Sequence, residues 1–244
     1  MQICYSLRKE NKTINQRELY YMNTDVMFPV ILIAQMFASQ RECDDCIQEC
    51  IALLHVPRNA LGITATPKGY ITGHLLLSST DSGNWIDLSV EKPLSITYDM
   101  VTRTAVRSDS KFILVIEKDG IFKRLYEDRF FDEIPCILIT GRGFPDLATR
   151  AMTHYLATEL KLPVLGICDW NPFGMALLMT YILGSFASGL EVGNDDPHQE
   201  TYRYCVHLKW IGLHYQDIVS LHLPDSVREP FSKVDRIKCR ALQK

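Results

Sequence analysis

The sequence predicts an α/β protein with a parallel sheet in its carboxyl part and a mixed α+β part before it. Residues 112–116, 137–140 and 164–168 are short, continuously apolar runs, which are typical of strands buried on both faces of a parallel sheet. Segments with apolar residues at helical spacing separate these runs. Strands that alternate with helices in this way favour a parallel α/β architecture.

The composition is that of an ordinary globular protein. The chain has 244 residues, 47% hydrophobic and 23% charged, enough for one large or two modest domains. No apolar run approaches the roughly 20 residues of a membrane-spanning helix, so no membrane association is expected. The net charge of −3 gives no basic field over the whole protein, so a nucleic-acid site would need a local patch. The eight scattered cysteines indicate a reducing compartment, cytosol or nucleus, rather than a disulfide framework.

The amino-terminal part begins with helix-like segments. Residues 15–22 are expected to be helical, with Asn15 as the N-cap and Glu18 at the matching position of a capping box. Residues 27–54 also carry apolar side chains at helical spacing, and a polar turn at residues 39–45 is expected to interrupt them.

Short strands are expected after these helices, at residues 63–66, 69–73 and 75–77. Helices followed by a β-hairpin are typical of a winged-helix module, and we predict such a domain at residues 1–92. Residues 93–110 have no strong periodicity, so we expect a linker there.

The carboxyl part, residues 111–244, is expected to repeat strand and helix. Its first strand ends at Glu117, and an amphipathic helix is expected at residues 121–131. The remaining predicted elements are a strand at 137–140, a Gly-rich turn at 141–146, a helix at 147–160, a strand at 164–168, a helix at 175–183 and a strand within 205–213. Strand–helix–strand repeats of this kind form parallel sheets with right-handed crossovers.

Oxygen-bearing side chains follow two of the predicted strands. Glu117 comes directly after the strand at 112–116, and Asp169 and Asn171 follow the strand at 164–168. Open α/β sheets place their sites at the carboxyl ends of strands, and Mg²⁺ prefers oxygen ligands with one or two carboxylates plus phosphate. The pattern therefore predicts a Mg²⁺ site at Glu117, Asp169 and Asn171. The alternative is that Glu117 begins a loop and Asp169 caps the following helix.

The turn Gly141-Arg142-Gly143 combines a flexible backbone with a guanidinium group. This combination suits the binding of phosphate. By itself the turn is weak evidence, but it adds weight to the predicted metal site.

Arg17 and Tyr21 are four residues apart on a predicted helix and therefore share a face. A phenol is a poor nucleophile at neutral pH because its ordinary pKa is about 10. A neighbouring guanidinium favours the phenolate and can also clamp a phosphate. The alternative is an amphipathic helix with aromatic core residues, and the pattern alone does not decide between Tyr20 and Tyr21.

Five motifs in a fixed order carry a resemblance to a known family. They are residues 17–21 (Arg-Glu-Leu-Tyr-Tyr), 56–58 with 68–69 (Val-Pro-Arg and Lys-Gly), 116–125 (from Ile-Glu-Lys-Asp to Phe-Lys-Arg-Leu), 141–146 (Gly-Arg-Gly-Phe-Pro-Asp) and 169–174 (Asp-Trp-Asn-Pro-Phe-Gly). Together they strongly resemble the catalytic A subunit of topoisomerase VI and its eukaryotic relative, the meiotic double-strand-break transesterase. The resemblance covers about residues 16–213, and the last motif is most similar to the plant branch.

This resemblance implies a winged-helix domain with a nucleophilic tyrosine, followed by a Toprim domain that binds Mg²⁺. On the matching positions it implies that Tyr21 is the nucleophile, that Arg17 assists it, and that Glu117 and Asp169 are the Toprim acids. It also implies DNA contacts from Lys68 and Arg142. The implied partners are double-stranded DNA, a second copy of the chain and a topoisomerase VI B-like subunit, in the nucleus.

The sequence departs from the family pattern at Asn171, where most relatives have a second aspartate. The loss of one negative charge should weaken Mg²⁺ binding unless a DNA phosphate compensates. The chain also has shorter ends than its relatives, so we expect a truncated form at both ends.

Three functions are consistent with these observations. The first is a topoisomerase-like, Mg²⁺-dependent DNA transesterase that makes double-strand breaks through a 5′-phosphotyrosyl intermediate. The second is a non-cleaving DNA-binding or assembly subunit, which Asn171 and the short ends favour. The third is a Toprim-type nuclease that uses water, against which the Arg17 and Tyr21 pair argues.

Overall fold

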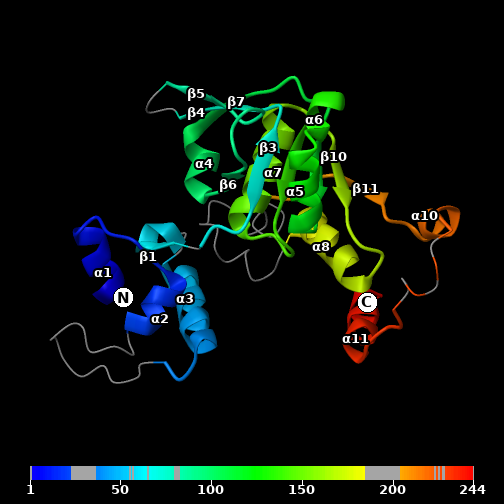
Figure 1. The fold of residues 1–244 in the computed structure, drawn as a ribbon. Helices are drawn as coiled ribbons and strands as arrows, with labels where there is room; N and C mark the ends of the chain where they lie inside the picture. Colours follow the sequence, from blue (N-terminus) through cyan, green and yellow to red (C-terminus); the bar gives the residue numbers. More distant parts are fainter. Residues whose placement is uncertain are drawn as a thin grey trace. The chain divides into compact units, whose positions relative to one another are not determined.

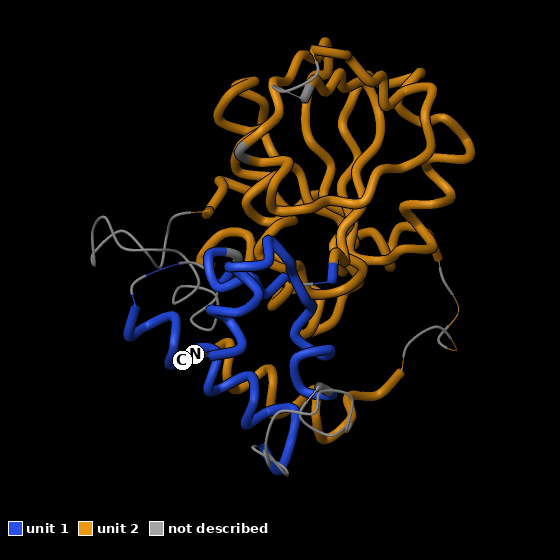
Figure 2. Tube along the Cα trace, turned by 90° about the vertical axis from the view of Figure 1, so that its left-hand side faces the viewer, with its two compact units in different colours: residues 1–66, 185–203 blue, residues 67–184, 204–244 orange. Residues whose placement is uncertain are grey.

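The computed structural model describes residues 2–22, 37–54, 56, 58–64, 66–79, 83–184, 204–222, 224, 226 and 229–243. The chain forms two compact units, coloured separately in Figure 2. Unit 1 comprises residues 1–66 and 185–203, and unit 2 comprises residues 67–184 and 204–244. Each unit encloses hydrophobic core of its own.

Unit 1 is mainly helical. Its described elements are α1 (Gln2–Lys9), β1 (Ile14–Asn15), α2 (Gln16–Met22), α3 (Gln40–Leu54), the 3-10 helix η1 (Arg58–Leu61) and β2 (Ile63–Thr64). The strands β1 and β2 pair in parallel. Leu19 of α2, three residues of α3 and Ile63 of β2 lie in one buried cluster, so packing of the two helices against the short sheet forms this core.

The predicted start of α2 is confirmed. The Asn15 N–H donates to Glu18 Oε2 over 2.7 Å, and the Glu18 N–H donates to Asn15 Oδ1 over 2.8 Å, which is a reciprocal capping box. The polar turn predicted at residues 39–45 is wrong, because α3 begins at Gln40. Ser39 Oγ accepts from the Glu42 N–H over 3.2 Å at the start of α3. Residues 27–36 of the predicted helical segment lie outside the described part.

A six-stranded sheet organises unit 2, with strand order β11-β10-β8-β9-β3-β6 (Figure 1). Four neighbouring strands are parallel: β11 (Leu208–Gly212), β10 (Val164–Ile167), β8 (Phe112–Ile116) and β9 (Cys136–Thr140). β3 (Tyr70–Gly73) and β6 (Leu94–Ser95) extend the sheet in antiparallel pairs. The predicted parallel α/β sheet is therefore confirmed.

Alternate residues of the parallel strands face two different cores. Ile113 and Val115 pack with Met152 and Leu177, which belong to α7 (Leu147–Glu159) and α8 (Pro172–Leu183). Leu114 lies in the other cluster, with side chains of α5 (Asp119–Glu127) and α6 (Phe130–Glu133). Because both faces are covered, continuous apolar runs are what these strands require.

The apolar runs at 69–73 and 75–77 do not form a hairpin with each other, and β4 (Leu76–Ser79) pairs in antiparallel orientation with the following strand, β5 (Trp85–Asp87), instead. β3 joins the six-stranded sheet, whereas β4 lies in a three-stranded sheet of order β5-β4-β7 with β5 and β7 (Thr104–Arg107). Gly73, the last residue of β3, has φ +109°, a left-handed conformation that redirects the chain before β4. The winged-helix assignment therefore stays a prediction.

The expected linker at residues 93–110 also differs from the structure. It contains β6, α4 (Tyr98–Arg103) and β7, so it is structured and pairs with both sheets. The compact units consequently divide between Thr66 and Pro67, and not near residue 92. The physical reason is that β3 pairs with β9, which ties residues 70–73 to the second unit.

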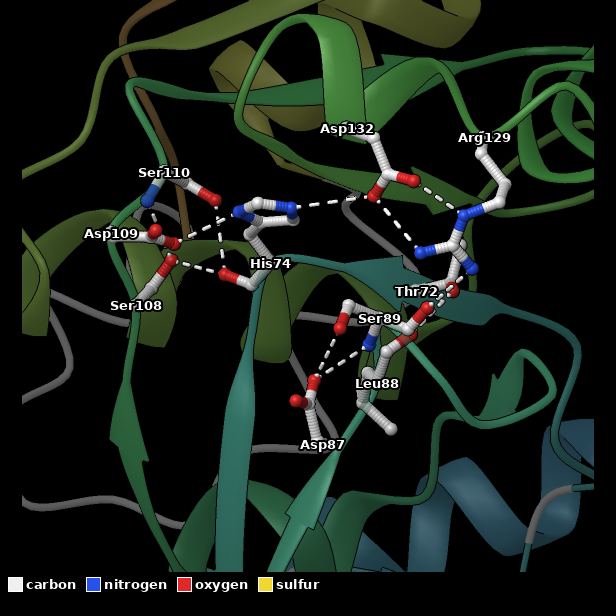
Figure 3. A network of polar contacts seen from close by, with 10 residues as sticks. All are labelled: Thr72, His74, Asp87, Leu88, Ser89, Ser108, Asp109, Ser110, Arg129 and Asp132. Carbon is white, nitrogen blue, oxygen red and sulfur yellow. Dashed lines mark hydrogen bonds and ion pairs between the residues drawn. The ribbon is translucent and has the colours of Figure 1, made fainter.

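A polar network fixes the chain where β3 gives way to β4 (Figure 3). His74 Nδ1 lies 3.0 Å from Asp109 Oδ1, and its Nε2 lies 3.6 Å from Asp132 Oδ1. Arg129 pairs with Asp132, lowers the pKa of that carboxyl, and donates through Nη1 to the Ser89 carbonyl over 3.0 Å. The network thus joins the β3–β4 junction to α6 and to the segment before β8.

None of the helices in the described residues is long and apolar enough to cross a membrane.

Candidate functional site

The structure brings Glu117 and Asp169 together at the carboxyl ends of two neighbouring parallel strands. Ile116 of β8 pairs in register with Ile167 of β10, so both acids emerge at one edge of the sheet. The Asp169 N–H donates to Glu117 Oε2 over 2.9 Å. This bond fixes the Glu117 carboxylate beside the segment that carries Asp169.

Lys118 balances part of the negative charge at this edge. Its Nζ lies 2.6 Å from Asp169 Oδ2. The hydrogen bond with Asp169 raises the pKa of Lys118, with a smaller contribution from Glu117. The pair is substantially exposed to solvent, so the attraction is screened and an incoming cation can compete with the ammonium group.

Asn171 begins α8 as its N-cap. Its Oδ1 accepts from the N–H groups of Phe173 and Gly174, over 2.9 and 2.8 Å. The cap of this helix is therefore Asn171, and not Asp169 as the alternative interpretation supposed. Pro172 at the first helical position is the sequence signal for this start.

Gly174 allows the close approach of α8 to the acids. A Cβ at this position would lie 2.6 Å from the Asp169 carbonyl oxygen, 3.0 Å from Glu117 Oε2 and 3.1 Å from Cys168 Cβ. Only a residue without a side chain fits this space. The sequence pattern does not single out Lys118 or Gly174 as parts of the site, although both lie within recognised motifs.

The predicted phosphate turn lies beside the same edge. The Gly143 N–H donates to the Glu117 carbonyl oxygen over 3.1 Å. Arg142 has φ +53°, and its guanidinium lies 4.0 Å from Asp119 Oδ1 and 5.4 Å from the centre of the Tyr70 ring. The backbone of the turn therefore contacts the Glu117 segment, whereas the half-exposed Arg142 side chain lies near Asp119 and Tyr70.

The backbone of Lys68 contacts Asp146, at the other end of this turn. Its N–H donates over 3.1 Å to Asp146 Oδ2, and Asp146 also caps α7 by accepting from the Thr149 N–H over 2.8 Å. The Lys68 segment is thus anchored to Asp146, at the end of the turn that contains Arg142.

Arg17 and Tyr21 lie on α2 of unit 1, and both side chains are exposed. Tyr21 is 57% exposed, whereas Tyr20 is partly buried against the core that contains Leu19. The two tyrosine rings contact edge to face, with centroids 5.4 Å apart. Of the two tyrosines, Tyr21 is the more exposed.

The donor set fits Mg²⁺ in two of the three predicted positions. Glu117 and Asp169 offer carboxylate oxygens at one edge, which suits a cation that retains waters and binds phosphate. The Asn171 oxygen already accepts two backbone bonds, so it has little capacity left for a metal. Within the described residues, no three histidine, cysteine or acidic side chains form a group that could hold a metal ion.

Comparison with known proteins gives matches over both units. The family model that describes the Toprim domain of Spo11 and of the topoisomerase 6 A subunit matches residues 112–244. The model described as Type IIB DNA topoisomerase matches residues 1–63.

The chain is similar to curated proteins of plants and mammals. It is 36% identical to the meiotic recombination protein SPO11-2 of Oryza sativa subsp. indica, over 100% of this chain and 58% of that protein. It is 31% identical to the A subunit of DNA topoisomerase 6 of Arabidopsis thaliana, over 96% of this chain and 50% of that protein. It is 28% identical to the meiotic recombination protein SPO11 of Mus musculus, over 100% of this chain and 57% of that protein. The chain thus spans between 50% and 58% of the length of these relatives.

Proposed function

Because the chain belongs to the family of Spo11 and the topoisomerase 6 A subunit, we propose that it is a Mg²⁺-dependent DNA transesterase that makes double-strand breaks. The observation that carries this proposal is the pair of acids Glu117 and Asp169 at the carboxyl ends of β8 and β10, where the Asp169 backbone N–H donates to the Glu117 carboxylate. The exposed Tyr21, on the same helix face as Arg17, supports it from the first unit.

In this proposal Tyr21 Oη attacks a phosphorus atom of the DNA backbone. A 5′-phosphotyrosyl ester forms, the bond to the 3′ oxygen breaks, the phenolic proton is released and the 3′ oxygen takes up a proton. Arg17 clamps the attacked phosphate and offsets its charge. Lys68 and Arg142 bind phosphates further along the strand and orient the DNA without reading its sequence.

Glu117 and Asp169 are the residues that would hold Mg²⁺ in a Toprim domain of this family. When bound, the ion would supply positive charge that stabilises the phosphoryl oxygens and the departing oxygen. In the absence of metal, Lys118 pairs with Asp169 and offsets the negative charge of its carboxylate. Asn171 assists by holding the start of α8, and so the position of Gly174, against both acids.

The proposed assembly is a homodimer in which Tyr21 of one copy acts with Glu117 and Asp169 of the other. Two such sites cut the two strands of one duplex. A topoisomerase VI B-like subunit would be the protein partner, and the nucleus the compartment. The domain assignment that accompanies this proposal is a winged-helix domain that carries Tyr21 and a Toprim domain that carries the acids.

The nucleophile is tested by trapping covalent protein–DNA adducts. The chain, with a B-type subunit, is incubated with plasmid DNA and Mg²⁺, denatured and assayed for DNA bound to protein. Tyr21→Phe should abolish the adducts because it removes the attacking oxygen, whereas the matched control Tyr20→Phe should retain them. Adducts that persist in Tyr21→Phe would falsify the assignment.

A second candidate is a non-cleaving DNA-binding or assembly subunit of the same family. The observation that favours it is the Asn171 oxygen, which caps α8 where most relatives are expected to offer a second carboxylate. Aspartate is as good an N-cap as asparagine, so Asn171→Asp keeps the helix start and adds an anionic ligand.

Asn171→Asp decides between the two candidates. If the chain is non-cleaving, adducts appear only in this variant. If the unaltered chain already forms adducts, the non-cleaving function is excluded.

A further inference from the structure

Three aromatic side chains form a stack at the carboxyl ends of β10 and β11. The Trp170 ring, from the loop after β10, lies on the Trp210 ring of β11 with centroids 5.4 Å apart and planes 10° apart. The His214 ring packs against Trp210 with centroids 4.4 Å apart and a tilt of 43°. We call Trp170, Trp210 and His214 the aromatic platform.

Backbone hydrogen bonds fix the two segments that carry the platform. The Cys168 N–H donates to the Gly212 carbonyl over 3.0 Å, and the Leu213 N–H donates to the Cys168 carbonyl over 2.9 Å. Trp210 Nε1 donates to the Gly212 carbonyl over 2.7 Å, and the His214 N–H donates to Asp217 Oδ2 over 2.6 Å. A ligand that stacks here would therefore immobilise little that is not already ordered.

Trp170 keeps an open surface. It remains 41% exposed although its indole ring stacks on that of Trp210, so a large part of the side chain is still open to solvent. A tryptophan that served only to fill a core would be much more deeply buried. An exposed flat ring that a parallel neighbour already holds in place is suited to stacking on another flat ring.

The position of the platform identifies the chemistry of its ligand. Trp170 directly follows Asp169, the carboxylate to which the proposed function assigns Mg²⁺ and, through it, a DNA phosphate. A nucleotide whose phosphate binds at that edge brings its base near the same loop. Every nucleobase has a π face, and stacking of bases on aromatic side chains tolerates any sequence.

The geometry points to the platform as a stacking site for an unpaired nucleobase of the DNA strand held at Glu117 and Asp169. This inference rests on the proposed function. Removing a base from an intact duplex carries an unstacking cost, which is least where the base is already unpaired. The preferred ligand is therefore a nucleotide in a bulge, at a nick or at a frayed end.

Two bulged duplexes of equal length test this inference by direct binding in the presence of Mg²⁺, the ion through which the proposed function holds a DNA phosphate at Glu117 and Asp169. One duplex has a single bulged 2-aminopurine nucleotide, and the other has an abasic residue at the same position. The unaltered full chain should bind the base-containing bulge about tenfold more tightly, the usual order for one base stacked on an aromatic ring. It should also quench the 2-aminopurine fluorescence, because the base stacks on indole.

Variants locate the effect. Trp170→Ala should abolish both the tenfold preference and the quenching, and Trp170→Phe should keep most of each because the ring face is retained. Trp85→Ala is the matched control, since Trp85 is 40% exposed but lies on β5 of the other sheet. It should bind as the unaltered chain does.

The outcomes separate this inference from the proposed function. Equal binding of the two bulges by the unaltered chain overturns the stacking site alone, and leaves the platform as a packing or protein-binding surface. A base preference that survives Trp170→Ala, or that Trp85→Ala removes, overturns it as well. If the unaltered chain binds no duplex, both the stacking site and the proposed function are overturned. If it prefers the base-containing bulge but forms no covalent adducts with plasmid DNA, only the proposed function is overturned.

Discussion

At the scale of single residues, the side-chain oxygen of Asn171 has two conceivable roles, as a metal ligand and as the N-cap of α8. As a metal ligand it would need its lone pairs directed at a cation, yet Oδ1 accepts from two backbone N–H groups. Capping is satisfied in the folded chain without any ligand. The residue therefore contributes to stability whether or not it contributes to chemistry.

Removing this cap should destabilise the chain by a measurable amount. Asn171→Ala leaves two N–H groups of the first turn of α8 without a side-chain acceptor, and the expected loss is about 1 kcal/mol. Urea unfolding at neutral pH measures it. Asn171→Asp should keep the stability of the unaltered chain once Mg²⁺ is present, and an alanine variant of undiminished stability would contradict the capping role.

Two buried thiols of unit 2, Cys136 and Cys168, should be inert. Burial raises the pKa of Cys136 to about 12 and that of Cys168 to about 12, with Glu117 and Asp169 adding to the effect at Cys168. Both remain protonated at pH 8, so an alkylating reagent should modify the more accessible Cys239 of α11 (Lys233–Leu242) first. Peptide mapping after a short pulse checks the order, and early labelling of Cys136 would contradict it.

The same thiols set a sign for alkaline stability. Between the ordinary thiol pKa near 9 and about 12, the unfolded chain has lost protons that the folded chain retains. The free energy of unfolding must therefore fall as the pH rises through this window. Below pH 9 these groups are protonated in both states and contribute no pH dependence.

At the scale of elements, the first turn of α8 requires glycine at position 174 because the Asp169 backbone lies close to it. Gly174→Ala would place a Cβ 2.6 Å from the Asp169 carbonyl oxygen, which is backbone and cannot swing aside. We expect a net loss of about 1–3 kcal/mol from this overpacking. Gly120→Ala in α5 is the matched control, because nothing lies within 4 Å of its added Cβ, and it should gain about 0.5–1 kcal/mol. Thermal unfolding of both variants compares them, and equal shifts would contradict the contact.

The sequence predicts some elements better than others. Those whose signal lies within the segment itself are predicted well, and those that depend on pairing with a distant segment are not. The apolar runs predict β8, β9 and β10 to within one residue, because a strand covered on both faces needs a continuous apolar run. The capping box at Asn15 is a local pattern and is also confirmed. The pairing of β3 with β9, about 70 residues away, leaves no local signal, so two adjacent apolar runs resemble a hairpin that does not form.

The site is partly predictable for the same reason. Strand ends bring Glu117 and Asp169 together, and the strands can be predicted from sequence. The Lys118 ion pair depends on side-chain directions that only the folded chain shows, whereas the cap at Asn171 has a local signal in Pro172. Whether Tyr20 or Tyr21 is accessible also depends on packing, since Tyr20 lies against the core of unit 1 and Tyr21 does not.

At the scale of the whole molecule, the division into two compact units predicts which fragments of the chain fold stably. All six strands of the central sheet lie in residues 67–184 and 204–244, including β3 and β6. A fragment of residues 67–244 should therefore unfold cooperatively. A fragment of residues 111–244, the predicted Toprim segment, lacks β3 and β6, exposes the edge of β9 and should aggregate or unfold at lower temperature.

Circular dichroism with thermal unfolding compares the two fragments at equal concentration. Matching midpoints and equal solubility would contradict the assignment of β3 to the core of unit 2. The intact chain is the reference for both.

The hydrogen bond between Asp169 and Glu117 also bears on when the molecule becomes able to act. It joins residues 52 positions apart and depends on parallel pairing of β8 with β10, and contacts so distant in sequence form late in folding. A slip of one residue would turn one strand's side chains to the opposite face. A DNA-cutting protein of the proposed kind would thus remain harmless during its own synthesis, and refolding in which Mg²⁺ binding preceded sheet formation would contradict this order.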